Sequence, residues 1–145
     1  MTKPLLPEGV TRLYLDTNIF IYLLEGEARF SEPVAKILTE ADARNITLVT
    51  SEFAVCECLV GAHRRGDPDL IAQYEAFFED ATLVFEMVAA GSPILAQAPA
   101  IAGTLRLKIL DALHVASALM AGCNGFLTND AGIPPIDGQL EVVRL

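Results

Sequence analysis

The sequence predicts an α/β protein in which helices cover both faces of a parallel sheet. Short apolar or β-branched runs alternate with longer segments of helical spacing, as in βαβ units. Two of these runs are followed by an acid, Asp16 immediately after the first and Asp130 after Asn129, at the edge where ligands of open parallel sheets bind. We expect strands at residues 13–15, 46–50, 81–85, 125–128 and 140–144.

Length and composition are those of one globular domain over residues 1–145, with residues 1–10 as an N-terminal tail. The chain has 145 residues, 52% of them hydrophobic, and a chain of this size buries about 70% of its unfolded surface. Its apolar stretches are interrupted well before the ~20 residues of a membrane span, and the N-terminus lacks an apolar signal-peptide core. We therefore expect a cytoplasmic protein without membrane contact.

The first helix is predicted over residues 17–24, with Gly26 after its end. Ser31 has the properties of an N-cap, because an acid and Pro33 follow it where the first helical turn favours them. We expect this second helix to reach about Arg44.

Ser51 and Asp67 are predicted to cap the next two helices. The first covers residues 52–64, and the second begins at Pro68, a residue tolerated at the first helical position. Apolar residues in the second recur at three-to-four spacing, which is typical of a helix face turned toward a core. They are Leu70, Ile71, Tyr74, Phe77 and Phe78.

Two more helices precede the last strands. One opens at Ser92 and contains Pro99, which we expect to kink or break the helix near Ala98, because proline lacks an amide proton. The other covers about residues 109–121 and closes at Gly122, the residue type expected just past a helix end.

Charge and cysteine content exclude several classes of protein. A formal net charge of −9 argues against a broad basic face that neutralises nucleic-acid phosphates. The three cysteines, Cys56, Cys58 and Cys123, cannot all pair, and they lack the spacing of a zinc site or a redox motif. Acidic excess is compatible with carboxylates gathered around divalent cations, which would then bind phosphate.

Two acids lie within segments that are otherwise mostly apolar. Glu57 is inside the predicted helix 52–64, and Asp111 opens a helix that is apolar almost all round. An unpartnered buried carboxylate is costly, and its usual remedies are a helix N-terminus, a cation or protonation. With Asp16 and Asp130 they would make four carboxylates at one crevice.

Each acid also has a purely structural interpretation. Asp16 could cap a strand end, Glu57 could be a satisfied helix acid, Asp111 could cap its helix, and Asp130 could be a turn residue. Their joint occurrence favours one site. Carboxylate oxygens suit Mg²⁺ or Mn²⁺, ions that polarise a phosphodiester and activate water. The residues alone therefore predict metal-dependent hydrolysis of a phosphate ester.

Four motifs resemble the PIN-domain family, particularly VapC-like toxins. They are Asp16-Thr17-Asn18 after the first strand, Ser51 followed six residues later by Glu57, Asp111-Ala112-Leu113-His114-Val115-Ala116, and Thr128-Asn129-Asp130 after the fourth strand. The likeness spans about residues 13–145 in the family's order. It implies a three-layer α/β/α fold with strand order 3-2-1-4-5, which would place the first and fourth strands side by side.

The resemblance also implies a function and its partners. Four acids would bind Mg²⁺ or Mn²⁺ and activate water against single-stranded RNA, while Asn18 and Thr128 would orient the carboxylates. The acids are Asp16, Glu57, Asp111 and Asp130. VapC-like ribonucleases dimerise and are silenced by a small VapB-like antitoxin, so we expect a homodimer and an antitoxin. The sequence departs from many relatives in the Pro-rich segment 131–138, where they carry a further Asp-Phe and a basic residue.

His114 and Lys108 are secondary candidates. His114, one turn after Asp111, could contact substrate or metal, or could be a hydrogen-bonded core residue. Lys108 could contact phosphate, as could Arg64, Arg65 and Arg106. The charges of Arg64 and Arg65 would equally complement the end of their helix.

Other functions stay open. One is a PIN-domain nuclease that processes RNA outside a toxin-antitoxin pair. A second is a haloacid-dehalogenase-like phosphatase, although Asn18 stands where that family carries its second Asp. The third is a non-catalytic α/β interaction module, against which the presence of all four acids argues.

Overall fold

The computed structural model describes residues 3–26, 28–81 and 84–145. Its strands form one sheet in the order β3-β2-β1-β4-β5, and each neighbouring pair is parallel. They are β1 (Arg12–Leu15), β2 (Thr47–Ser51), β3 (Glu86–Val88), β4 (Gly125–Thr128) and β5 (Glu141–Arg144). The expected strand order is confirmed, and β1 lies between β2 and β4.

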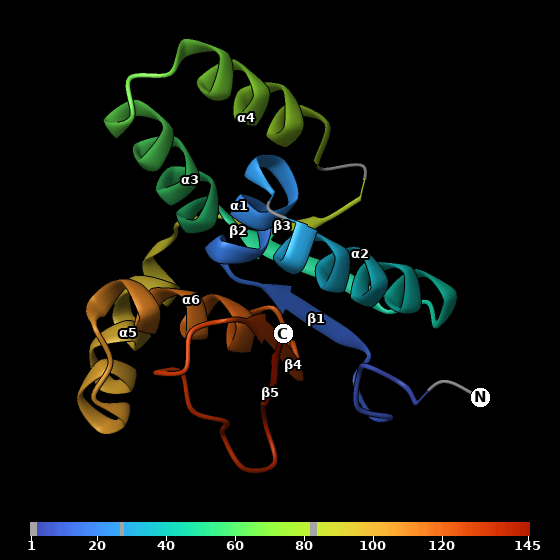
Figure 1. Ribbon diagram of the computed structural model, residues 1–145. Coiled ribbons are helices and arrows are strands. Elements are labelled where there is room, and N and C mark those ends of the chain that lie inside the picture. The colour runs from blue at the N-terminus through green and yellow to red at the C-terminus, as the bar shows by residue number, and fades with distance from the viewer. Residues whose placement is uncertain (1–2, 27, 82–83) are drawn as a thin grey trace.

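Helices cover both faces of this sheet (Figure 1). They are α1 (Thr17–Glu25), α2 (Ala28–Ala43), α3 (Glu52–Arg64), α4 (Pro68–Asp80), α5 (Ser92–Leu105) and α6 (Ile109–Met120). Leu13 and Leu15 of β1 pack into the core beneath α1 to α4. Tyr14, between them, points to the opposite face and packs against Val115 and Ala118 of α6. The predicted three-layer α/β/α architecture is confirmed.

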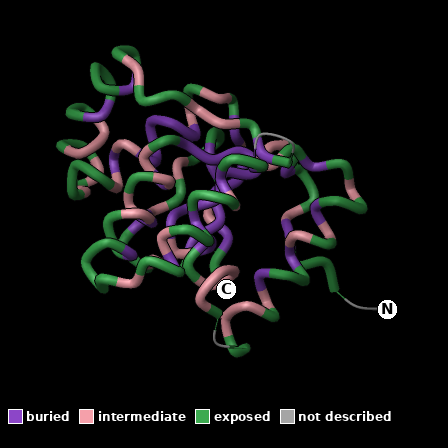
Figure 2. Tube along the Cα trace, turned by 90° about the horizontal axis from the view of Figure 1, so that it is seen from above, coloured by how far each residue is buried: buried purple, intermediate pink, exposed green. Residues whose placement is uncertain are grey.

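Burial is concentrated on the central strands, which run through the middle of the molecule in Figure 2. All four residues of β4 and the last three of β1 are buried, as expected for a parallel sheet covered on both faces. The carboxyl ends of these two strands lie side by side, and the region around them, bordered by α1, α3 and α6, is called the crevice below. None of the helices in the described ranges is long and apolar enough to cross a membrane.

The predicted third strand, residues 81–85, is wrong. Thr82 and Leu83 lie outside the described residues, and the strand that pairs with β2 starts one residue later, at Glu86. The amides of Val84 and Phe85 both bond to the carbonyl of Ala81, at 2.9 and 2.7 Å. These bonds close a turn after α4, so the two amides are not available to a strand ladder.

Two predicted helix features are also wrong. Ser31 is not an N-cap, because α2 begins at Ala28 and includes Pro33. A proline near the start of a helix removes only one intrahelical bond, so the preceding turn can form. Of the kink or break expected near Ala98, the break does not occur, since α5 is helical through Pro99 to its end, while the kink stays a prediction.

The segment predicted as an N-terminal tail is docked on α2 over its described residues. The amides of Leu5 and Leu6 donate to the carboxylate of Glu40 at 2.9 and 2.7 Å, and Arg44 donates to the backbone carbonyl of Leu6. Leu6 is 2% exposed. Leu6 thus contributes to the core, whereas Leu5 is held by its backbone with its side chain exposed.

Candidate active site

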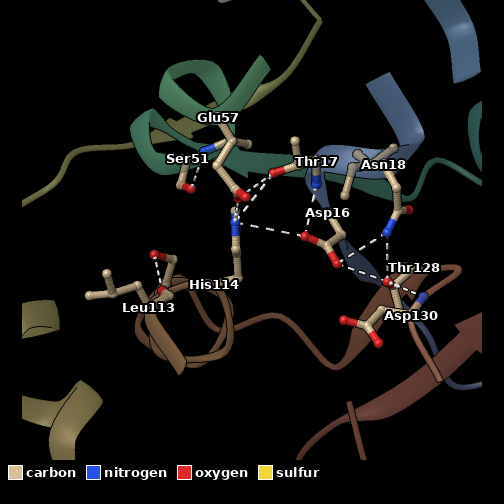
Figure 3. Close-up of polar contacts among 12 residues, drawn as sticks. Asp16, Thr17, Asn18, Ser51, Glu57, Leu113, His114, Thr128 and Asp130 are labelled. Carbon is tan, nitrogen blue, oxygen red and sulfur yellow. Dashed lines mark hydrogen bonds and ion pairs between the residues drawn. The ribbon is translucent and has the colours of Figure 1, made fainter. Parts of the chain in front are cut away.

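The four predicted acids meet at the carboxyl edge of β1 and β4. Asp16 follows β1 and is the N-cap of α1, while Asp130 lies two residues after β4. Glu57 lies in α3 and Asp111 in the first turn of α6. In Figure 3, Glu57 and Asp130 lie on either side of Asp16, and the charges of Asp16 and Asp130 act on Asp111. Residues from both ends of the chain therefore share one crevice.

Asp16 is held at the centre of this crevice and is 5% exposed. Its Oδ1 accepts the amide of Thr17 at 2.8 Å, and its Oδ2 accepts the hydroxyl of Thr128 at 2.8 Å. Burial raises the pKa of Asp16, and the attraction of His114 with the bonds from Thr128 and Thr17 offsets only part of that rise. A charged Asp16 thus remains under-compensated, which favours a nearby cation.

Glu57 is half-buried and keeps its charge. One oxygen, Oε1, accepts the hydroxyl of Thr17 at 2.7 Å and makes a short hydrogen bond with Nε2 of His114. Burial on its own would raise the pKa of Glu57, but the hydrogen bonds from His114 and Thr17, with the attraction of His114, outweigh burial and lower it. Glu57 is therefore a satisfied helix acid that also faces the crevice.

Asp130 has the turn geometry that its structural interpretation predicted. Its Oδ1 accepts the amide of Gly132 at 2.8 Å, and its own amide donates to Oγ1 of Thr128 at 2.9 Å. The turn fixes the carboxylate beside Thr128, the residue that binds Asp16. The structural and functional interpretations of Asp130 are thus compatible.

Asp111 does not cap α6, whose N-cap is Lys108, so that interpretation is wrong. Burial raises the pKa of Asp111, and the charges of Asp130 and Asp16 raise it further, while His114 lowers it. Like charges that lie close together repel one another unless a cation lies between them. Asp111 is therefore the clearest sign that the crevice concentrates negative charge.

Asp111→Asn is expected to raise the melting temperature of metal-free protein near pH 7 by roughly 1–3 °C. The substitution removes the repulsion from Asp130 and Asp16, and it also gives up the favourable interaction of a first-turn acid with the helix dipole. The raised pKa of Asp111 shows that repulsion and burial outweigh that interaction. Thermal unfolding in excess chelator measures the change.

Asp69→Asn is the matched control, because Asp69 is the first-turn acid of α4. Here the substitution removes only the dipole interaction, so the melting temperature should stay level or fall. A fall in both variants would contradict the inferred crowding of charge around Asp111.

The donor set fits a hard divalent cation. Among residues 3–26, 28–81 and 84–145, no three Asp, Glu, His or Cys side chains lie close enough together to hold one ion as they stand. The four acids nevertheless offer only oxygen ligands, which Mg²⁺ and Mn²⁺ prefer. Two of them, Asp16 and Asp111, have raised pKa values, so the electrostatic demand at this edge is for positive charge.

The other predicted site residues lie in three kinds of environment: beside Asp16, at the exposed start of α6, and in the core. The amide nitrogen of Asn18 lies 3.2 Å from Oγ1 of Thr128 and 3.5 Å from Oδ2 of Asp16, so Asn18 and Thr128 both hold Asp16. Lys108 is exposed at the start of α6. His114 is 1% exposed and hydrogen-bonded, which is the core position that its structural interpretation predicted.

Three further residues support the acids without having been predicted as site residues. The hydroxyl of Thr17 links Glu57 to the start of α1. The hydroxyl of Tyr14 lies 2.6 Å from Nδ1 of His114 and 2.7 Å from Oγ of Ser51. Thr17 and Ser51 lie in two of the motifs that resemble the PIN-domain family, whereas the signal for Tyr14 is only that a polar group between Leu13 and Leu15 requires a buried partner.

A cavity of about 330 Å³ adjoins the acids between α3 and α6. Its apolar walls include Phe53, Val60 and Leu110, Glu57 lies on its lining, and Arg64 is the one basic residue there. Arg64 is exposed and makes no ion pair within the described part of the chain. The crevice thus continues into a groove that combines apolar surface with a positive charge.

Comparisons with known proteins agree with this architecture. A family model described as PIN domain matches residues 13–138, whereas no curated protein matches the sequence. VapBC2 from Rickettsia felis, bound to a promoter DNA fragment, is 15% identical with a TM-score of 0.65, covering 90% of this chain and 98% of that chain. A toxin-antitoxin complex from Klebsiella pneumoniae is 24% identical with a TM-score of 0.62, covering 84% of this chain and 92% of that chain.

A third solved structure is Mycobacterium tuberculosis VapC20, described as a sarcin-ricin loop cleaving toxin. It is 18% identical, with a TM-score of 0.61, and the match covers 79% of this chain and 86% of that chain. At such identities the likeness establishes a shared fold.

Proposed function

Because the chain belongs to the PIN-domain family, we propose that it is a Mg²⁺- or Mn²⁺-dependent endoribonuclease that hydrolyses phosphodiester bonds of single-stranded RNA. The observation that carries this proposal is the gathering of four acids at the carboxyl edge of β1 and β4, with the charges of Asp16 and Asp130 raising the pKa of Asp111. An interaction module that binds no cation would gain nothing from carboxylates gathered in this way, because their charges repel one another.

Asp16, Glu57, Asp111 and Asp130 are the residues that would hold the ion. When bound, a divalent ion polarises the phosphodiester and lowers the pKa of a water molecule. Thr128 and Asn18 keep the Asp16 carboxylate in place through their hydrogen bonds.

The groove beside Glu57 supports single-stranded RNA as the substrate. Unpaired bases stack on aromatic and apolar side chains, and phosphates bind basic ones. Phe53 and Leu110 offer the first kind of surface, while Arg64 offers the second. Lys108, exposed three residues before Asp111, is a further phosphate contact in this proposal.

We further propose that the ribonuclease is the toxin of a type II toxin-antitoxin pair, acting in the cytoplasm as a homodimer silenced by a VapB-like antitoxin. The support is that the solved structures sharing the fold include a VapBC complex and a toxin-antitoxin complex. An upstream reading frame for a small DNA-binding protein that co-purifies with this chain would favour this role over RNA processing outside such a pair.

The test is cleavage by the purified chain, freed from any bound protein. Single-stranded RNA should be cut with Mg²⁺ or Mn²⁺, remain intact with excess chelator, and be cut again when the ion is restored. Duplex RNA of the same sequence should be cut more slowly, since its bases are not available for stacking. Cleavage that persists in chelator, or the lack of cleavage with either ion, would overturn the assignment.

Arg64→Gln is expected to raise KM for single-stranded RNA by roughly 3- to 10-fold with little change in kcat. Because the variant neutralises one phosphate fewer, the salt dependence of binding also falls by about one unit of slope. KM measured over a series of salt concentrations gives both quantities.

Arg65→Gln is the control for the neighbouring position. Arg65 is already paired with Glu25, so removing its charge should leave KM close to that of the native protein. Equal increases in KM at both positions would mean that KM depends on the net charge of the protein and not on the place of Arg64 in the groove.

A further inference from the structure

A row of buried hydrogen bonds crosses the molecule and ends on Glu57. It starts at Ser51, passes through the hydroxyl of Tyr14 and the ring of His114, and reaches Oε1 of Glu57. Ser51 and Tyr14 are fully buried and His114 is 1% exposed. The row therefore joins β1 and β2 to α6 and α3, and only its last member, the half-buried Glu57, reaches solvent.

The chemistry of these groups fixes the donor at the end of the row that reaches Glu57. Burial raises the pKa of Tyr14 well above its ordinary value, so its phenol keeps its proton. Because Nε2 of His114 faces a carboxylate oxygen, which can only accept, that nitrogen carries a proton and donates it. His114 thus presents an N–H to Oε1 of Glu57, while its Nδ1 is hydrogen-bonded to the Tyr14 hydroxyl.

The far end of the row fixes one oxygen of Glu57 and leaves the other open. Both His114 and the hydroxyl of Thr17 bond to Oε1. Within the described part of the chain no donor bonds to Oε2. A carboxylate anchored by one oxygen can present the other to a ligand in a fixed orientation.

We propose that Tyr14 and His114 are positioning residues that fix the Glu57 carboxylate and so set the affinity of the acidic crevice for divalent cations. The inference rests on the proposed metal-dependent function. In this arrangement Tyr14 acts through His114, and His114 acts through the carboxylate of Glu57, with its Nε2 also 3.8 Å from Oδ1 of Asp16. Removal of a residue that orients a metal ligand through hydrogen bonds lowers metal affinity by roughly 10- to 100-fold.

A purely structural role would predict a different outcome. The ring of Tyr14 stacks on Phe126 with centroids 5.0 Å apart, so Tyr14→Phe keeps the ring and its packing and removes only the hydroxyl. If the row served stability alone, the variant would unfold more easily but bind metal as before. If the row positions Glu57, the dissociation constant for the ion must rise.

The experiment is Mn²⁺ titration by calorimetry of the native chain and of Tyr14→Phe, with thermal unfolding as a parallel check of folding. We expect the Mn²⁺ dissociation constant to rise by roughly 10- to 100-fold in Tyr14→Phe. Tyr74→Phe is the matched control, because it removes the hydroxyl of another fully buried tyrosine. The Tyr74 hydroxyl is bonded to Glu25 and takes no part in the row of hydrogen bonds that reaches Glu57. The Mn²⁺ affinity of this variant should therefore stay within about twofold of the native value.

His114→Gln keeps the proposal testable if Tyr14→Phe folds poorly. A glutamine amide can still donate near the position of Nε2, so this variant should retain more Mn²⁺ affinity than His114→Leu, which has no donor. Equal affinity in the native chain, Tyr14→Phe and both His114 variants would overturn the positioning role and leave the nuclease assignment intact. A native chain that binds no Mn²⁺ at all would instead remove the proposed function, and this inference with it.

Discussion

Asp16→Asn is expected to reduce RNA hydrolysis by more than about 100-fold while the protein stays folded. Loss of a residue that only hydrogen-bonds a metal ligand already lowers metal affinity or activity by roughly 10- to 100-fold. Asp16 is itself one of the acids proposed to hold the ion, and it lies at the centre of the crevice. Asparagine is as good an N-cap as aspartate, so its side-chain oxygen can still accept the amide of Thr17 that caps α1. Initial rates of cleavage, with circular dichroism as the folding check, measure the effect.

Asp67→Asn controls for the substitution itself. Asp67 is the N-cap of α4 and accepts the amide of Leu70 at 3.1 Å, so the same atoms are exchanged at the same kind of helix position. This variant should cleave RNA at the native rate. Retention of full activity by Asp16→Asn would refute the central role assigned to Asp16.

Phe20→Ala is expected to lower the free energy of unfolding by about 3–5 kcal/mol. The Phe20 ring is fully buried and contacts the rings of Phe77, Phe78 and Phe85, with centroids 5.9, 5.3 and 5.5 Å away. It joins α1 to α4 and to the turn before β3. Since domains are stable by only about 5–15 kcal/mol, much of the protein would be unfolded under mild denaturant, as urea titration would show.

A phenylalanine-to-alanine substitution at a less buried ring shows how much of the lost stability comes from core packing and how much from removal of any aromatic ring. Phe30 in α2 is half-buried and stacks on Tyr22 with centroids 4.5 Å apart. Phe30→Ala should cost less than about 2 kcal/mol, because little core volume is emptied. A similar loss for both variants would mean that the cluster around Phe20 is not the main anchor of α1.

Local sequence rules predicted most of the fold. Ser51 and Asp67 cap the helices as expected, and Gly122 adopts a positive φ just past α6. The errors arose where tertiary contacts outweighed local preference. Phe85 has the composition of a strand residue, yet its amide closes the turn on Ala81 and its ring fills the core beside Phe20.

The four acids of the site could be predicted from the sequence, whereas most of the residues that hydrogen-bond them could not. Asp16 and Asp130 stand where strands end, and Glu57 and Asp111 stand out because acids are unusual in apolar helices. The hydroxyl contacts of Thr17 and Tyr14 depend on how three elements pack against one another, which no local pattern encodes. His114 could not be assigned from its place in the helix, because either face of α6 would have suited the sequence.

The sheet order has a consequence for a newly made polypeptide. Thr128 is bonded to Asp16 across 112 positions of the chain, and β4 pairs with β1 although α1 to α6 lie between these two strands in the sequence. Because synthesis runs from the N-terminus, a nascent chain carries Asp16 well before Asp130 and the strand that seats it. The acidic centre can therefore be assembled only after β4 has left the ribosome and paired with β1.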